Sequence, residues 1–548
     1  MGRRRVGRVA AAGLAGVTAY DLLQRRHAIL RNFPVVGHFR YLLELFGPEL
    51  RQYIVTGDDE ERPFNRDQRR WVYASAKSQT NTFGFGTDND MESVGGMLAI
   101  KHAAFPVAPA ADRAPGGFPD YAIPAGKVVG GARGRRHAFR PASLVNVSGM
   151  SFGALSGPAV QALNEGCKMA GCLHGTGEGG LSPHHRHGGD LVFQIGTGYF
   201  GCRDERGRFS LDHLQETISG APVRAIEIKL SQGAKPGLGG LLPAAKVTPE
   251  IAAIRGVQTG ADCVSPPGHS AFGSADELLD FVESVAEATG LPVGIKSAVG
   301  EQEFWDELAG LMETGARGVD FVTVDGGEGG TGAAPLAFTD HVALPFKLGF
   351  ARVYAAFARL GITERVVFVG SGKLGFPDAA LFALALGCDT VSIGREAMLA
   401  IGCIQAQRCH TGRCPTGVAT QNPWLTRGLD PELKAVRHAT YVRALRGELL
   451  ALARTCGVTH PALVDPGRLE IVTEGFRSAP LHEVFGYEPG WAVPTPARRA
   501  EIEALMSERP QWRLAGPELG PVPGDGTGGD GSVTGSPAQQ PRFPPVTG

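Results

Sequence analysis

The feature that most constrains the fold is a regular alternation between residues 144 and 402. Short apolar runs alternate there with amphipathic stretches at helical spacing. The runs are LVNVS (144–148), LVFQIG (191–196), AIEIKL (225–230), CVSPP (263–267), PVGIK (292–296), FVTVDG (321–326), VVFVGSG (366–372) and TVSIGR (390–395). Strands that alternate with helices form parallel sheets with crossover connections. Eight runs over about 260 residues match the size of a (β/α)8 barrel.

A doubly wound open sheet is the alternative, and it would carry its phosphate-binding glycines after the first strand. Here SGMSFGALS follows the first run, and no G-x-G-x-x-G opens a helix. The sequence therefore predicts an α/β protein with a (β/α)8 barrel over 144–402. A helical and mixed region (21–143) precedes the barrel, and a helical region (422–515) follows a cysteine-rich loop (403–421).

Composition limits the remaining regions and the possible partners. Of the 33 residues from 516 to 548, 16 are Gly or Pro, which predicts a disordered tail. The formal net charge is −1, so the chain lacks the basic excess of a nucleic-acid-binding protein. Nine cysteines in 548 residues are too sparse for a disulfide scaffold.

The N-terminal segment 1–20 allows three interpretations. Arg3, Arg4, Arg5 and Arg8 precede an uncharged run of twelve residues, which is shorter than the about 20 needed to span a bilayer. The segment is compatible with a first helix with a basic end, a membrane-surface anchor, or a secretory signal of the twin-arginine kind. We expect a cytoplasmic protein, with possible membrane association through this segment.

Late strand ends predict a phosphate site. In (β/α)8 barrels the active site lies at the C-terminal ends of the strands, and phosphate often binds beyond strands seven and eight. Glycines there free backbone N–H groups for an anion, and cationic side chains add charge. The seventh run ends in Gly370, Ser371 and Gly372, which Lys373 follows, and the eighth run ends in Gly394 and Arg395.

Other strand ends predict a second anion site. Lys229 lies at the end of the third run, just before Leu230, and Lys235 stands six residues later. A lysine near the core is costly unless it is paired, so the two lysines favour an anionic ligand. Solvated loop lysines are the alternative. Glu178 lies in the glycine-rich loop 176–180. The cluster His184–His187 favours a basic loop near the site entrance.

Three cysteines follow the eighth run with the spacing C-x5-C-x4-C: Cys403, Cys409 and Cys414. Three thiolates in one loop suit a soft metal centre. An iron–sulfur cluster with three ligands fits best beside a phosphate-bearing cofactor such as a flavin. Zinc with His410 as fourth ligand and free core thiols are the alternatives.

Taken together, the motifs resemble a known family. They are SGMSFGALS, GTGEGG, EIKLSQGAKPG, SPPGH, GGEGGTGAAP and GCIQAQRCHTGRCPTGVATQ. Over roughly residues 21–480 the chain resembles the FMN-binding synthase domain of glutamate synthase, in its stand-alone form. The resemblance implies FMN and a 3Fe–4S cluster as cofactors.

The resemblance also implies roles for individual residues. Met150 and Ser151 would contact FMN and substrate, and Lys229 would approach the flavin ring. Glu178 and Lys235 would hold 2-oxoglutarate or 2-iminoglutarate, and with Lys229 they form the implied catalytic set. The glycine turns after strands seven and eight would hold the FMN phosphate, and the three cysteines would bind the cluster.

The implied activity is the reductive amination of 2-oxoglutarate to glutamate. No NAD(P)H-binding fingerprint is visible, so electrons are expected from ferredoxin or an NAD(P)H-oxidising subunit, and ammonia from a separate glutaminase. Two positions depart from the family: Tyr199 replaces an arginine, and Leu241 replaces a substrate-contacting glutamine. The alternatives are a synthase for another amine or keto acid, such as N-methylglutamate synthase, and a non-enzymatic electron-transfer subunit.

Overall fold

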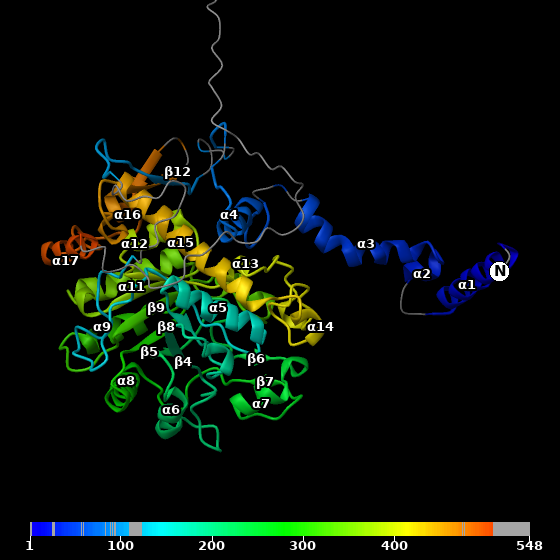
Figure 1. Ribbon diagram of the computed structural model, residues 1–548, viewed down its shortest axis with the longest axis horizontal. Coiled ribbons are helices and arrows are strands. Elements are labelled where there is room, and N and C mark those ends of the chain that lie inside the picture. Colours follow the sequence, from blue (N-terminus) through cyan, green and yellow to red (C-terminus); the bar gives the residue numbers. More distant parts are fainter. Residues whose placement is uncertain are drawn as a thin grey trace, which may run out of the picture.

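The computed structural model describes residues 3–24, 28–55, 57, 60–82, 84–87, 89, 91, 95–108, 123–473, 475 and 477–507. Its centre is a closed barrel of parallel strands, as the sequence predicts (Figure 1). In chain order the barrel strands are β2 (Val145–Val147), β3 (His174–Gly175), β4 (Leu191–Ile195), β5 (Val223–Lys229), β8 (Val293–Ser297), β9 (Phe321–Asp325), β10 (Val367–Ser371) and β11 (Thr390–Ile393). Pairing of β11 with β2 closes the barrel.

One predicted barrel strand is wrong. The run 263–267 forms only β7 (Cys263–Val264), which pairs antiparallel with β6 (Leu241–Leu242) outside the barrel. Pro266 and Pro267 follow, and proline has no N–H to continue a ladder. The second barrel strand is instead β3, whose two residues are too few to give a periodic signal.

Helices that cover the barrel have clear local signals. In α8 (Ala275–Thr289) the Ser274 side chain caps the N-terminus, and Gly290 ends the helix at φ 72°. Its buried residues, including Leu278, Val282 and Val285, recur at helical spacing and face the core. The other covering helices are α5 (Gly157–Ala170), α6 (Leu211–Ile218), α7 (Pro249–Arg255), α9 (Glu303–Met312), α11 (Phe346–Arg359), α12 (Pro377–Ala385) and α13 (Arg395–Ala400). The short helix α10 (Leu336–His341), between β9 and α11, has no buried residue.

Segments from both ends of the chain pack on one side of the barrel. The long helix α15 (Pro431–Thr455) contacts α5, α12 and α4 (Arg66–Ala76). A three-stranded antiparallel sheet joins β1 (Leu98–Ile100), β12 (Leu469–Thr473) and β13 (Arg477–Pro480). The remaining elements are α14 (Pro423–Thr426), α16 (Leu481–Val484), α17 (Pro496–Ser507), and the 3-10 turns η2 (Pro183–His185), η3 (Ala244–Lys246), η4 (Thr363–Arg365), η5 (Cys409–Thr411), η6 (Pro461–Leu463) and η7 (Pro466–Arg468).

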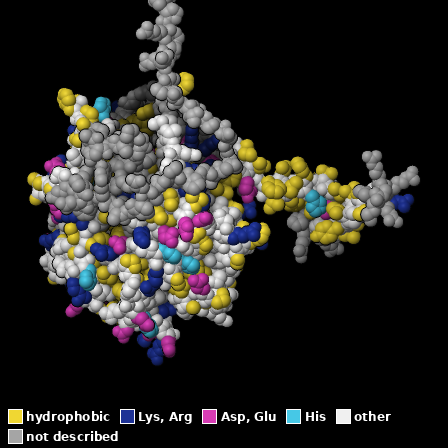
Figure 2. Space-filling model, viewed as in Figure 1, with side chains coloured by type: hydrophobic (Ala, Val, Ile, Leu, Met, Phe, Trp, Pro, Cys, Tyr) yellow, Lys and Arg dark blue, Asp and Glu magenta, His cyan; other side chains and the backbone are white. Residues whose placement is uncertain are grey.

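An N-terminal arm extends away from the barrel (Figures 1 and 2). It consists of α1 (Arg3–Leu23), α2 (Ala28–Asn32), α3 (Gly37–Leu50) and the π-helical turn η1 (Arg51–Val55). Segment 1–20 is thus helical from Arg3 onward. Among the described residues, no helix combines the length and apolar character required to cross a membrane. The predicted tail 516–548 lies outside the described residues.

Candidate active site

An ion pair lies at the C-terminal end of the barrel. Lys229, the last residue of β5, places its Nζ 2.9 Å from Oε1 of Glu178 and donates to Oε1 of Gln232 at 2.7 Å. Burial raises the pKa of Glu178, but Lys229, Lys235 and Arg255 outweigh burial and hold the pKa below its ordinary value. The glutamate is therefore an anion at neutral pH, as the paired lysine requires.

Lys235 is a buried cation beside this pair. Its side chain is 7% exposed, and its Nζ makes a long hydrogen bond of 3.5 Å to the carbonyl of Ala333. Burial lowers the pKa of Lys235, which Glu178 partly offsets. Within the described part of the chain no carboxylate forms an ion pair with Lys235. The geometry leaves its ammonium group able to bind an anion.

A second ion pair, to which the sequence analysis gave no role, lies beside the first, because Lys296 is the register partner of Lys229. Nζ of Lys296 in β8 lies 3.5 Å from Oδ1 of Asp325 and donates to Oγ of Ser148 at 3.1 Å. Burial lowers the pKa of Lys296, but Asp325 and Glu227 outweigh it and raise the pKa above its ordinary value. The Asp325 carboxylate also accepts from the backbone N–H of Gly233 at 2.8 Å, which fixes the loop that carries Lys235.

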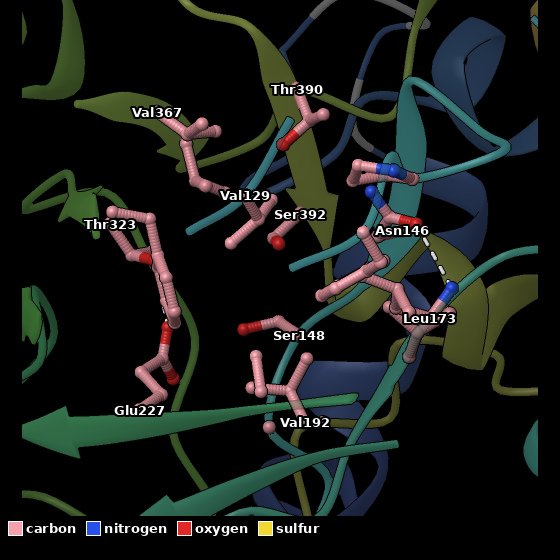
Figure 3. Close-up of a pocket in the computed structure, with 18 residues that line it drawn as sticks. Val129, Asn146, Ser148, Leu173, Val192, Glu227, Thr323, Val367, Thr390 and Ser392 are labelled. Atoms are coloured by element: carbon pink, nitrogen blue, oxygen red, sulfur yellow. Dashed lines mark hydrogen bonds between the residues drawn. The ribbon is translucent and has the colours of Figure 1, made fainter. Parts of the chain in front are cut away.

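The barrel interior below these groups combines apolar side chains, such as Val129 and Val367, with several polar ones (Figure 3). Glu227 accepts hydrogen bonds from Gln194 at 2.5 Å and from Thr323 at 2.7 Å. Ser148 and Ser392 line the same cavity. Barrel interiors are usually filled by branched apolar side chains. Glu227 and Lys229 share one face of β5 because strand side chains alternate, so both point inward.

Met150 and Ser151 lie where β2 ends. The Met150 carbonyl accepts from His185 Nε2 at 3.1 Å, and the His185 Nδ1 lies 2.8 Å from Ser182 Oγ. Burial lowers the pKa of His185 to about 4. The expectation of a basic loop at 184–187 is therefore wrong for His185, which is a neutral, buried support for Met150. A Cβ at Gly177 (φ +69°) would come within 2.6 Å of the Ser151 N atom, so glycine allows loop 176–180 to approach Ser151.

The predicted phosphate residues come together at the ends of β10 and β11. Lys373 and Arg395 both lie over the Phe64 ring, at 5.2 and 5.0 Å. Burial lowers the pKa of Lys373, and Arg395 lowers it further. Neither cation forms an ion pair within the described ranges. Gly394 is the N-cap of α13 and supplies no side-chain cap, so two neighbouring cations and the backbone N–H groups of this turn suit a phosphate.

The other residues predicted to bind phosphate in these turns have different surroundings. Gly372 has a φ of +142°, a conformation that favours glycine. Ser371 ends β10, and its carbonyl accepts from Gly326 N at 2.8 Å. Gly370 lies inside β10, where a Cβ would come within 2.9 Å of Cys388, Leu374 and Phe346. Packing against these neighbours accounts for this glycine, and its predicted contact with phosphate stays a prediction.

The cysteine loop follows α13. Burial raises the pKa of Cys403 to about 12 and raises that of Cys409. Burial acts in the same direction on Cys414, but hydrogen bonds from backbone N–H groups of residues 416, 418 and 419 lower its pKa below the ordinary value. Lys246 donates to the carbonyls of Ala154 at 2.7 Å and Cys409 at 3.4 Å.

The backbone hydrogen bonds to Cys414, which lower its pKa, suit a thiolate ligand at this position. Among the described residues no three His, Cys, Asp or Glu side chains converge on one metal ion, and His410 is exposed. A cluster of several irons is held by thiolates on different irons, so it does not require convergence on one point. The cluster itself stays a prediction.

Tyr199 takes part in a network that ends at Lys229. Its hydroxyl lies 3.1 Å from His269 Nδ1 and accepts from the N–H of Ala271 at 3.1 Å. His269 Nε2 donates to the Lys229 carbonyl at 2.9 Å, so Nδ1 accepts from the tyrosine hydroxyl. Burial lowers the pKa of His269, which keeps the ring neutral.

The other departure from the family, Leu241, lies on β6 and is 46% exposed. Its neighbour Gly240 lies close to Glu178, because a Cβ at Gly240 would be 2.8 Å from Glu178 Oε1.

Comparison with known proteins identifies the family. The model of the conserved region in glutamate synthase matches residues 133–459. The glutamate synthase large subunit-like protein YerD of Bacillus subtilis is 38% identical over 470 residues, covering 80% of this chain and 89% of YerD. The chain belongs to the glutamate synthase family. Membership confirms the resemblance seen in the motifs and supports the expected oxidoreductase class.

Other relatives match a smaller share of their length. Archaeal glutamate synthase [NADPH] of Methanocaldococcus jannaschii is 37% identical over 57% of this chain and 59% of the relative. The archaeal-type enzyme of Thermotoga neapolitana is 35% identical over 62% and 63%. The chain thus spans about three fifths of these two relatives. Among solved structures, A198G:L230A flavocytochrome b2 with sulfite bound shares 14% identity at a TM-score of 0.41, over 85% of this chain and 93% of that chain. A likeness this weak carries no inference about the site.

Proposed function

We propose that the protein is a flavin- and iron–sulfur-dependent oxidoreductase that aminates 2-oxoglutarate reductively to glutamate. The observation that carries the proposal is the group Glu178, Lys229 and Lys235, in which Lys235 is a buried cation without a carboxylate partner in the described ranges. A non-enzymatic electron-transfer subunit has no need of such an anion pocket. Family membership supports the same reaction class.

Residues of this chain are candidates for holding the two cofactors that the resemblance implies. Lys373, Arg395 and the uncapped start of α13 would hold the FMN phosphate. Cys403, Cys409 and Cys414 would hold a 3Fe–4S cluster. When bound, FMN supplies hydride chemistry and the cluster supplies single-electron transfer.

In the proposed reaction, 2-oxoglutarate and ammonia condense to 2-iminoglutarate with loss of water. Two electrons and two protons then convert the imine to glutamate. Lys235 binds a carboxylate of the substrate, and Lys229 holds Glu178 as an anion at the edge of the site. The Tyr199–His269 network fixes the Lys229 backbone, and His185 fixes that of Met150.

Leu241 favours a second candidate, a synthase for a different keto acid or amine. Its exposed apolar side chain cannot supply the amide contact that the resemblance assigns to this position. The test is anaerobic: reduced protein is mixed with 2-oxoglutarate, oxaloacetate or pyruvate, each with ammonium or methylamine, and reoxidation of the flavin absorbance is followed. Fastest reoxidation with 2-oxoglutarate and ammonium supports the proposal. Faster reoxidation by another pair selects the second candidate, and none with any pair contradicts both.

A further inference from the structure

Charge is strongly segregated along this nearly neutral chain. The first 43 residues contain eight arginines and one acidic residue, Asp21. The remaining 505 residues contain 46 basic and 54 acidic side chains. Such asymmetry is typical of a segment that contacts an anionic surface.

The single acid of this segment is held inside it. Asp21 Oδ2 accepts from the N–H of Val35 at 2.8 Å, and Oδ1 lies 2.9 Å from His38 Nε2. Asp21 is fully buried by these contacts. Among the residues whose side chains the structure describes, Arg8, Arg31 and Arg40 are exposed, and the sequence offers little acidic compensation before Glu44.

Helix α3 exposes an apolar stripe. Phe39, Leu42, Leu43, Phe46 and Leu50 recur at helical spacing along one face, and all are between 41% and 61% exposed. The Arg40–Glu44 ion pair, at 2.6 Å, lies outside this stripe, as does Leu45, which is 61% exposed. Figure 2 shows hydrophobic side chains gathered along this part of the arm. An exposed apolar stripe with charged residues outside it is the pattern of an interfacial membrane helix.

Helix α1 adds a second apolar surface. Val9, Leu14, Val17 and Tyr20 are between 41% and 73% exposed, and all four follow the arginines at positions 3–8. A basic end next to exposed apolar side chains suits the headgroups and upper acyl chains of anionic lipids. Nucleic acid would use the charge but not the apolar stripes.

The base of the arm is attached to the cysteine loop. Tyr53 donates to the carbonyl of Ile404 at 2.8 Å, Gln52 donates to that of Gln405, and Glu49 pairs with Arg408. The C-terminal end of the arm therefore lies beside the loop that carries Cys403.

We propose that the arm, residues 3–55, lies on the surface of an anionic lipid bilayer and brings the cysteine loop close to that surface. Lipid accounts for both the arginines and the exposed stripes of α1 and α3. This inference is independent of the proposed reaction, because it needs neither cofactor nor substrate.

The experiment is flotation of the full-length protein with vesicles of phosphatidylcholine, with and without phosphatidylglycerol. We expect binding to the anionic vesicles that weakens at high salt. Changing Arg3, Arg4, Arg5 and Arg8 to Gln should lower partition at least about tenfold, since each basic residue contributes roughly fivefold. Phe39→Ser with Phe46→Ser should cause a loss of similar size through the lost apolar contact.

Phe105→Ser is the matched control, because Phe105 is 92% exposed but lies outside the arm. The partition of this variant onto vesicles should equal that of the wild type. The oligomeric state of each protein is measured in parallel by size-exclusion chromatography with light scattering. Three results would each overturn the proposal. They are no binding to vesicles, equal binding to both vesicle types at all salt concentrations, and a dimer that requires the arm and forms equally with and without vesicles. The proposal would also be overturned if the protein isolated from its own cells lacked the arm, as measured by its intact mass.

Discussion

Replacing Lys235 by methionine separates a binding role from a structural one. The side chain is 7% exposed, and its ammonium group has a hydrogen bond of 3.5 Å to the Ala333 carbonyl. Burial lowers the pKa of Lys235, which means that the fold disfavours its charge. Methionine keeps most of the apolar chain and removes that cost. We therefore expect the free energy of unfolding to stay within about 1 kcal/mol of wild type or to rise.

Ligand binding should respond in the opposite direction. Loss of one charge-assisted contact costs about 1.5–3 kcal/mol, or roughly 10- to 150-fold in affinity. The assay is titration of 2-oxoglutarate, followed through the flavin spectrum, with chemical denaturation run on the same preparations. Lys235→Arg keeps the charge and should lose less affinity than Lys235→Met.

The contrary pattern would refute this reasoning. If Lys235→Met binds 2-oxoglutarate like wild type and loses more than about 1 kcal/mol of unfolding free energy, Lys235 is a structural residue. The substrate carboxylate would then have to be bound elsewhere in the site.

The Glu178–Lys229 pair should stabilise the fold at pH values above the ordinary glutamate pKa of 4.5 and lose that effect as the pH falls below it, because the folded-state pKa of Glu178 is lowered. If the free energy of unfolding of Glu178→Gln varied with pH as that of the wild type does, this prediction would be contradicted. In a double-mutant cycle, Glu178→Gln and Lys229→Gln should each cost about 3 kcal/mol and the pair clearly less than the sum, whereas additive losses would deny the coupling. Arg395→Met should lower FMN affinity about tenfold or more, measured by flavin release, while the exposed Arg359→Met should not; equal release from both would remove the phosphate assignment. Cys409→Ser should lose iron and acid-labile sulfide but keep FMN, and stoichiometric zinc without sulfide in the wild type would disprove the cluster.

Much of the fold could be predicted because strong local signals coincide with the elements. Strands such as β9 and β10 are largely apolar runs followed by glycine, and α8 carries both its cap residues and its apolar spacing. The strand β3 could not be predicted, since its two residues, His174 and Gly175, owe their conformation to pairing with β2 and β4. The run at 263 misled because its apolar character ends in two prolines.

For the site, residues at strand ends could be predicted and their supports could not. Lys229 and Arg395 follow apolar runs, so the barrel rule places them at the same end. Phe64 lies more than 300 residues from Lys373 and Arg395 in sequence, and only tertiary packing brings its ring beneath them. His185 stands in a cluster that looks basic, and only burial shows that it is neutral.

A single turnover with labelled ammonium tests the central claim most directly. Protein reduced anaerobically, with its FMN content measured, is mixed with 2-oxoglutarate and 15N-ammonium, and the products are analysed by mass spectrometry. The account predicts labelled glutamate in amounts that follow the reduced cofactor, and much less of it from Lys235→Met at low 2-oxoglutarate. Complete reoxidation of the flavin without labelled glutamate would contradict it.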